Sequence, residues 1–375
     1  MTVYIIVFWI LALIAILMEM NLTRNAKLTL LAFAWLVLVV IVGLRWQTGN
    51  DWPNYYSFYI HLPSPPEQFK SFEPGYRFFS FLIWKTGLPF AGFNLIYVAI
   101  YLALMFASFI CLNFEISGWL VLQLYSPFLF GLEGTTRQVM ALAICMFSVR
   151  YILSRNWLKF LLCVAVATTF HVSAFAFLLA WPLSRFRLTF RRVWVIFGIV
   201  LVASLLDLGG KAFQAAENHI AALQLVDLAS HLQLEAQSST QEFQHVAGFA
   251  LLPTIERVSL LTLFLLCFRL YNKESDQLYL KLFFFSIIIM VLLSSTAYVL
   301  ADRVSLYFSI FQIHLLALLT RRMNRPLLRQ LCCVALLLVS ASRLYTATHA
   351  SAPRIFVPYK GVLINRDVRR DPGWF

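Results

Sequence analysis

An all-helical, polytopic integral membrane protein is the fold that this sequence predicts, and three observations support it. The chain has 375 residues, of which 61% are hydrophobic and only 13% are charged, whereas about 25% of the residues of a soluble domain are charged. Its mean hydropathy is +0.78. Apolar runs of about 17 to 25 residues, the length that crosses a bilayer, recur along the chain. We therefore predict one membrane domain over residues 1–375, with about 12 spanning segments, short half-spans included.

The basic loops between the apolar runs place the spans. Because Lys and Arg concentrate in short cytoplasmic loops, the basic stretches are assigned to the cytoplasm and the N-terminus to the outside. The first run, from Tyr4 to Met18, lacks the basic start and the cleavage site of a signal peptide and is counted as a span. The basic stretches are 21–27, 149–159, 184–192, 268–274 and 320–329. The predicted spans are 3–20, 28–44, 90–112, 118–133, 137–152, 157–170, 171–183, 193–209, 246–270, 277–300, 303–320 and 327–344.

Three segments depart from plain spans. Residues 72–89 have a Pro and a Gly near each end, with only about eleven residues between them. Because so few residues cannot cross a bilayer, we predict an interfacial or re-entrant helix here. Residues 157–183 are basic on both flanks, which favours two half-spans that meet at 168–174, where the backbone needs protein or a watery cavity around it. Residues 210–245 have the apolar spacing of an amphipathic helix on the outer face. The predicted periplasmic segments are 45–89, 210–245 and 345–375.

The net charge of +13 arises from 30 Lys and Arg against 17 Asp and Glu. In a soluble protein such an excess indicates nucleic-acid binding, but here most basic residues lie in the short loops that orient the chain, so no nucleic-acid partner is predicted. Glycine loops for nucleotides, His pairs at metal spacing and an Asp-x-Asp motif are absent, so we predict no metal and no cofactor. The cysteines all lie in apolar runs and are expected to be buried thiols: Cys111, Cys145, Cys163, Cys267, Cys332 and Cys333.

Five arginines are exceptions to the positive-inside pattern. Arg45, Arg77, Arg137 and Arg303 lie at the outer ends of spans, and Arg257 lies inside one. A charged side chain in a bilayer faces a cavity or a partner; the neighbouring Glu256 points elsewhere on the helix. Since the guanidinium group matches phosphate oxygens and stays charged, the pyrophosphate head of a lipid carrier is the predicted ligand. For Arg77, the alternative to ligand binding is a side chain that extends to the membrane interface and keeps its charge in water.

Aromatic and acidic side chains accompany these arginines. Sugar rings stack on aromatic faces, although an interfacial aromatic belt explains part of the set. Asp51 and Glu73 are each candidates for a general base on a sugar hydroxyl or for a residue that holds an arginine. The aromatic residues are Trp46, Trp52, Tyr55, Tyr56, Phe72 and Tyr76.

Two further polar residues lie in or beside apolar runs. His171 lies at the predicted break, beside Thr168, Thr169 and Ser173, and is either a functional residue or a satisfied core residue. Asp302 directly precedes Arg303 and is either its local partner or a ligand for a sugar hydroxyl.

Five short motifs occur in order across most of the chain. They are RWQTGNDWPNY (45–55), FEPGY (72–76), EGTTRQVMALAI (133–144), TFHVSAF (169–175) and ADRVSLYF (301–308). Together they resemble the EpsG family of Wzy-type polysaccharide polymerases. The family pattern is matched by Arg45, Gly49, Asp51, Glu73, Pro74, Arg137, Gln138, His171, Ser173 and Arg303. Segment 210–245 and the C-terminal tail lie outside the resemblance, so substrate choice is expected to depend on them.

The resemblance implies an all-helical enzyme of a bacterial inner membrane, active at the periplasmic face. It would move a growing glycan from undecaprenyl pyrophosphate to the non-reducing end of the next undecaprenyl-pyrophosphate-linked unit, alongside a flippase and a chain-length regulator. The product would be O-antigen or another exopolysaccharide. From the residues and the resemblance together, the predicted catalytic residues are Asp51, Glu73, His171, Arg137 and Arg303. The predicted substrate-binding residues are Arg45, Arg77, Arg257, Gln138, Tyr55, Trp52, Tyr76 and Asp302.

Three other functions remain as alternatives. An O-antigen ligase would move the same donor onto lipid A core. A membrane acyltransferase would also use an intramembrane His and outer arginines. A transporter would move the lipid-linked unit without making a bond, but the sequence lacks the internal repeats that many transporters have.

Overall fold

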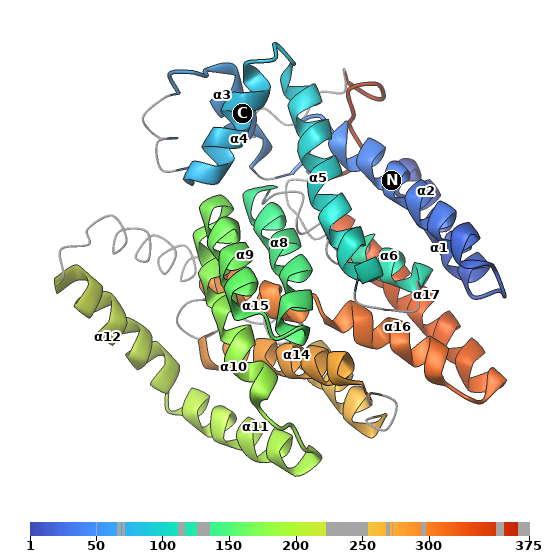
Figure 1. Ribbon diagram of the computed structural model, residues 1–375, viewed down its shortest axis with the longest axis vertical. Coiled ribbons are helices and arrows are strands. Elements are labelled where there is room, and N and C mark those ends of the chain that lie inside the picture. The colour runs from blue at the N-terminus through green and yellow to red at the C-terminus, as the bar shows by residue number, and fades with distance from the viewer. Residues whose placement is uncertain are drawn as a thin grey trace. The chain divides into compact units, whose positions relative to one another are not determined.

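The computed structural model is helical throughout most of the part of the chain that it describes (Figure 1). The described residues are 1–49, 51–65, 69, 72–111, 117–125, 136–222, 254–267, 271, 273–293, 298–349 and 356–366. Within these ranges the extended structure amounts to an isolated antiparallel bridge between Arg45 and Gly361. The predicted all-helical class is confirmed. The chain divides into two compact units: Met1–Phe175 together with Leu316–Phe375, and Ala176–Leu315.

Six helical stretches among the described residues are long and apolar enough to cross a membrane. They are α2 (Arg24–Gly43), α5 (Phe90–Cys111), α8 (Thr136–Leu153), α14 (Glu274–Leu293), α15 with α16 (Tyr298–Ser309 and Gln312–Arg322) and α17 (Pro326–His349). There is a seventh if one span is formed by α11 (Phe190–Leu205) together with the start of α12 (Leu208–Ala222). The chain bends by 69° between these two helices. The chain thus fits a multi-pass membrane protein, but the predicted number of about 12 spans is not confirmed. Several predicted spans correspond to shorter apolar helices, such as α1 (Thr2–Met18) and α9 (Trp157–Phe170).

The first unit is a series of neighbouring helices. Along it, α1 packs against α2 and α6 (Gly118–Leu124), α2 against α5, α5 against α8, and α8 against α9. Two short helices, α3 (Trp52–Ile60) and α4 (Pro74–Trp84), both pack against α5, and α4 also packs against α9. Each short helix has a proline in its first turn, where the missing N–H costs no hydrogen bond. The short helix predicted within 72–89 is therefore present as α4.

The predicted break within 157–183 is confirmed at His171. Helix α9 ends at Phe170, and His171 adopts an extended conformation with φ −156° and ψ 123°. The chain continues as a 3₁₀-helix, η3 (Val172–Leu179), and then α10 (Ala180–Arg185). Because a helix start leaves backbone N–H groups without intrahelical partners, the break presents such groups to other side chains, and the N–H of Val172 donates to Glu73 Oε1 at 3.4 Å.

In the second unit, α14 packs against α10, α11, α12 and α15. Side chains tie these helices to backbone carbonyls: Ser204 Oγ donates to Val291 O at 2.7 Å, and Lys281 Nζ donates to Ser184 O at 2.8 Å. A further helix covers 254–266. Helix α12 forms the first part of the amphipathic helix predicted over 210–245, and residues 223–245 lie outside the described ranges.

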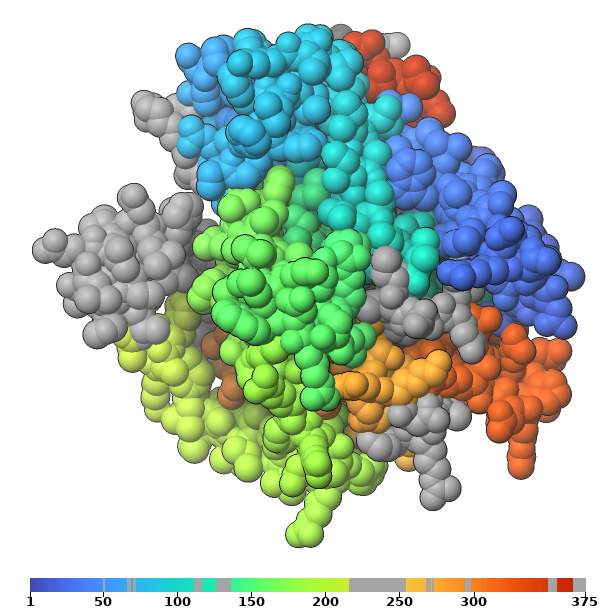
Figure 2. Space-filling view, viewed as in Figure 1, coloured from blue at the N-terminus to red at the C-terminus, as the bar shows by residue number. Residues whose placement is uncertain are grey.

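The C-terminal segment 356–366 is part of the first unit. It runs alongside residues 44–46: the N–H of Trp46 donates to Lys360 O at 2.8 Å, and the N–H of Val362 donates to Leu44 O at 2.8 Å. Tyr359 Oη also donates to Ile41 O in α2, at 2.8 Å. In Figure 2 the red atoms of this segment lie beside the cyan start of α5. The tail thus helps to build the end of the unit where α2 ends and α5 begins.

The cysteine prediction holds in part. Of the described cysteines only Cys145 is buried, and Cys163, Cys267, Cys332 and Cys333 are partly exposed. These four lie on helix faces that other helices cover incompletely, a surface that lipid covers in a membrane protein.

Replacing Gly75 with Ala is expected to destabilise the first unit by about 1–3 kcal/mol, the usual cost of overpacking. A Cβ at this position in α4 would collide with Thr169 Oγ1 and lie 2.8 Å from the carbonyl oxygen of Thr169, so α4 would have to move away from α9. Thermal unfolding in detergent measures the effect. The matched control is Gly198→Ala in α11, where a Cβ meets no atom within 4 Å and the helix gains about 0.5–1 kcal/mol. Equal unfolding temperatures for the two variants would contradict the close approach.

Candidate functional site

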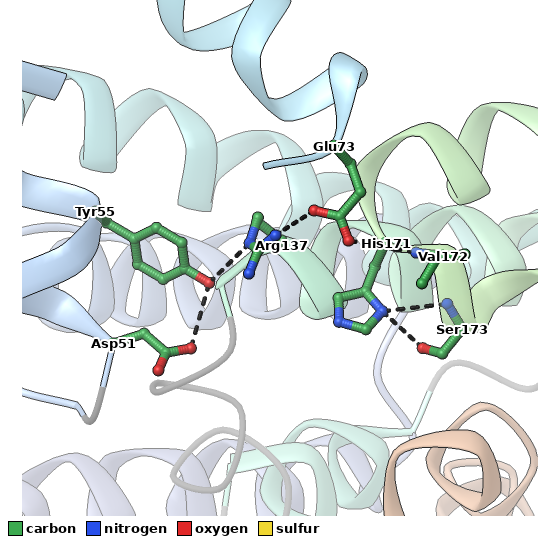
Figure 3. A network of polar contacts seen from close by, with 7 residues as sticks. All are labelled: Asp51, Tyr55, Glu73, Arg137, His171, Val172 and Ser173. Carbon is green, nitrogen blue, oxygen red and sulfur yellow. Dashed lines mark hydrogen bonds and ion pairs between the residues drawn. The ribbon is translucent and has the colours of Figure 1, made fainter. Parts of the chain in front are cut away.

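An ion pair between Glu73 and Arg137 lies at the centre of the candidate site (Figure 3). Glu73 is the N-cap residue of α4, and Arg137 is the second residue of α8. Arg137 Nη1 donates to Glu73 Oε2, and the two side chains are only 21% and 15% exposed. Hydrogen bonds between charged groups are stronger than neutral ones and fix geometry. The pair therefore sets the position of the guanidinium group relative to α4.

Tyr55 connects Arg137 to a second carboxylate. Arg137 Nε donates to Tyr55 Oη at 3.4 Å, and Tyr55 Oη donates to Asp51 Oδ2 at 3.5 Å. Asp51 is the N-cap residue of α3 and Tyr55 lies one turn further on, so both face the same side of α3. Burial raises the pKa of Tyr55 to about 12, with the charge of Arg137 opposing the shift. The phenol therefore stays protonated near neutral pH and can donate to Asp51 while it accepts from Arg137.

Aromatic rings hold the guanidinium group of Arg137 from the sides. Its Cζ lies 4.3 Å from the ring centroid of Phe72 and 5.9 Å from that of Tyr55, distances at which a cation is attracted to a ring. Nε and Nη1 are bonded to Tyr55 and Glu73, whereas Nη2 makes no hydrogen bond within the described part of the chain. The rigid group thus keeps one edge that can bind an anion.

The break in the helix supplies the other neighbours of Glu73. One carboxylate oxygen accepts from Arg137 and the other from the N–H of Val172. His171 points its ring to Ser173: Nδ1 lies 2.7 Å from Ser173 Oγ and accepts from the N–H of Ser173 at 3.4 Å. This acceptor role places the ring proton of a neutral His171 on Nε2. In that tautomer the lone pair of the ring is already used by Ser173.

Arg45 supports the start of α8 from within the core. Arg45 is 4% exposed, its Nη2 donates to Thr136 Oγ1 at 2.9 Å, and its buried Nε has no hydrogen-bond partner among the residues that the structure describes. Thr136 directly precedes Arg137, so Arg45 fixes the turn that carries the central guanidinium. Its backbone lies in the bridge to Gly361, which links this support to the C-terminal segment.

The other predicted residues of the first unit differ in exposure. Gln138, Trp52 and Tyr76 are 2%, 3% and 0% exposed, respectively. Their burial suits a role in holding the site: the ring of Tyr76 packs against Tyr55 with centroids 5.4 Å apart. Arg77 is exposed on α4, as the predicted snorkelling alternative requires.

The second unit contains a separate polar cluster around Arg257. Arg257 Nη1 donates to Ser305 Oγ at 3.0 Å, and Nη2 lies 3.6 Å from Asp302 Oδ1. The side chain of Arg257 is 15% exposed and that of Asp302 is 57% exposed. Arg303, the next residue of α15, is half-buried. Asp302 is thus the partner of an arginine distant in the sequence.

Sequence reasoning missed two residues of these clusters, Ser305 and Thr136. Asp302 and Ser305 lie three residues apart and therefore on one face of α15, a spacing that could have indicated a shared partner such as Arg257. Thr136 and its contact with Arg45 gave no signal, because a threonine at a helix start is a common feature.

Comparison with known proteins gives one family. The model of the EpsG family matches residues 28–360, which include both polar clusters. A search of curated proteins and a search of solved structures found no match.

Proposed function

Since this chain belongs to the EpsG family, we propose that it polymerises lipid-linked repeat units of a polysaccharide. Membership suggests a polysaccharide polymerase-type function, and the apolar helices fit a multi-pass membrane protein. The finer proposal is an enzyme of the bacterial inner membrane with its active site on the periplasmic side. It transfers the growing glycan from undecaprenyl pyrophosphate to the non-reducing end of the next lipid-linked unit.

The observation that carries the proposal is the fixed guanidinium group of Arg137. In the proposed reaction, a hydroxyl oxygen of the acceptor sugar bonds to the anomeric carbon of the donor, and the bond from that carbon to the pyrophosphate oxygen breaks. Negative charge grows on the departing pyrophosphate. A donor that is already held in place stabilises such charge without having to reorganise, and Glu73, Tyr55 and Phe72 hold Arg137 in this way.

Glu73 is proposed as a positioning residue and Asp51 as the base. Both oxygens of Glu73 already accept hydrogen bonds, from Arg137 and Val172, and the Nδ1 lone pair of His171 accepts from Ser173. Asp51 is only partly buried and lies in the same network through Tyr55. It therefore suits the role of taking the proton from the acceptor hydroxyl.

Within the second unit, Arg257 and Arg303 are proposed as phosphate ligands. Arg257 is held by Ser305, but its distance to the exposed Asp302 is long for an ion pair. A phosphate can replace this carboxylate, because the Asp302 side chain is 57% exposed and is free to turn into solvent while the oxygens of the phosphate satisfy the guanidinium group.

Purified protein in nanodiscs, supplied with lipid-linked repeat units from cells that lack the native enzyme, tests the proposal. Without any added metal, a ladder of lengthened glycans on lipid is expected. Transfer of a unit only to lipid A core would indicate a ligase, and acylation of the unit would indicate an acyltransferase. Passage of intact units across a bilayer with no new glycosidic bond would indicate a transporter. Each of these three outcomes would overturn the proposed polymerisation.

A further inference from the structure

A concave site lies in the first unit, beside the network of Asp51, Tyr55 and Arg137. Its volume is about 630 Å³, within the range of about 300–1,000 Å³ that is typical of small-ligand sites. It is formed by α3, the turn between α4 and α5, the start of α5 and the C-terminal segment. The side chains that matter for its chemistry are those of Trp46, Tyr56, Trp84, Val362 and Arg366.

Aromatic faces dominate the lining. Trp46, Tyr56 and Trp84 are all partly exposed, so their rings are available to a ligand. Behind them, the buried ring of Trp52 stacks on Tyr56 with centroids 4.9 Å apart and an interplanar angle of 10°. Trp46 packs edge-on against Tyr56 at 5.6 Å. The rings are thus held in place before a ligand arrives, which lowers the entropic cost of binding.

A charged side chain stands at the edge of these rings. The Cζ of Arg366 lies 5.4 Å from the ring centroid of Trp46, and the side chain is exposed. The adjacent Asn365 is anchored, since its Nδ2 donates to Tyr359 O at 2.9 Å. A guanidinium group in this place can donate to hydroxyl or carboxylate oxygens.

We propose that this pocket is a sugar-binding subsite for the glycan part of the substrate, a proposal that rests on the proposed polymerase function. A pyranose ring has an apolar C–H face, which suits the rings, and a rim of hydroxyl oxygens, which suits Arg366. A lipid tail would match the rings but would leave the guanidinium group without a partner. Helix α3 joins the two sites, because Tyr55 contacts Arg137 and the next residue, Tyr56, lines the pocket.

The C-terminal segment gains a function from this assignment. Val362 and Arg366 both come from it, and its backbone pairing with residues 44–46 places it next to Trp46. Two segments far apart in the sequence therefore build one subsite, and changes in the tail would alter the glycan that is accepted.

The test measures binding of free repeat-unit oligosaccharide, released from the host's lipid-linked units by mild acid, to the full-length protein in nanodiscs. Trp84→Ala and Arg366→Gln are each expected to raise Kd about fivefold to tenfold, the effect of losing one aromatic or charged contact. Arg366 is exposed, so its replacement leaves the core intact. The matched control is Trp157→Ala, a 59% exposed tryptophan on α9 outside the pocket, with an unchanged Kd.

Unchanged Kd values for both pocket variants would overturn the inference. So would competition for the pocket by undecaprenyl phosphate that carries no sugar, since that result would assign the pocket to lipid. The polymerisation assay separates the two proposals. If the wild-type protein makes no polymer but the pocket variants bind the oligosaccharide more weakly than wild type does, only the proposed function fails. If the wild-type protein makes polymer and the pocket variants bind the oligosaccharide as well as wild type does, only the proposed subsite fails.

Discussion

Replacing Arg137 with Lys is expected to reduce chain growth about 10²–10³-fold, the usual effect of losing one donor to a developing negative charge. Lysine keeps the positive charge but has no planar fork. It cannot bond to Tyr55 and Glu73 and still present a fixed N–H edge to an anion. The network of Figure 3 therefore loses its orientation even though its net charge is unchanged.

The rate of glycan elongation in nanodiscs measures this loss. Arg150→Lys is the matched control, because Arg150 lies in the last turn of the same helix, in a stretch assigned to the cytoplasmic side. Its replacement should leave elongation within about twofold of wild type, since it lies outside the proposed site of the leaving group. Normal long-chain polysaccharide from the Arg137 variant would remove the main support for a role in pyrophosphate departure.

Asp51→Asn and Glu73→Gln are expected to separate the base from the positioning residue. If Asp51 takes the acceptor proton, Asn should lower elongation about 10²–10⁴-fold and abolish the rise of the rate with pH that an ionising base produces. Glu73→Gln keeps an oxygen that can accept from Arg137 or Val172 and loses only the charge. It should therefore cost about tenfold, the loss of one charge-assisted hydrogen bond, and keep the pH-dependent rise.

Rates measured across a pH series in one membrane preparation check this pair of results. Asp207→Asn, at the junction of α11 and α12, serves as a control for the chemical change itself; Asn tolerates the positive φ of 49° found there. If the elongation rate no longer rises with pH in the Glu73 variant but still rises in the Asp51 variant, the two roles are exchanged.

Many of the helices were predictable from the sequence, because apolar runs indicate membrane spans and basic loops indicate the side of the membrane on which the spans end. The break at His171 was predicted because both flanks of 157–183 are basic, which a single span does not accommodate. The number of spans was not confirmed, since hydropathy marks an apolar run without showing how much of it forms one continuous helix. The predicted run 171–183, for example, is a 3₁₀-helix over Val172–Leu179 followed by an α-helix over Ala180–Arg185.

The candidate site was predictable in its residue types and much less in its pairing. Glu73 and Arg137 were both singled out, but 64 positions separate them, and no periodicity connects them. For Arg257, the only acid considered was its chain neighbour Glu256, whereas the partner that the fold supplies is Asp302. The docking of residues 356–366 was missed because backbone hydrogen bonds to 44–46 hold it, and these carry no sequence signal.

The backbone pairing of the tail also sets an order of events during biosynthesis. Thr48 Oγ1 donates to the carbonyl of Lys360 across 312 positions, so this end of the first unit cannot be completed before residues 356–366 have been synthesised. The segment that contains Gly361 must leave the ribosome before Arg45 gains its bridge to that residue. A product that stops before residue 356 would therefore insert its earlier helices into the membrane yet lack the backbone partners of residues 44–46.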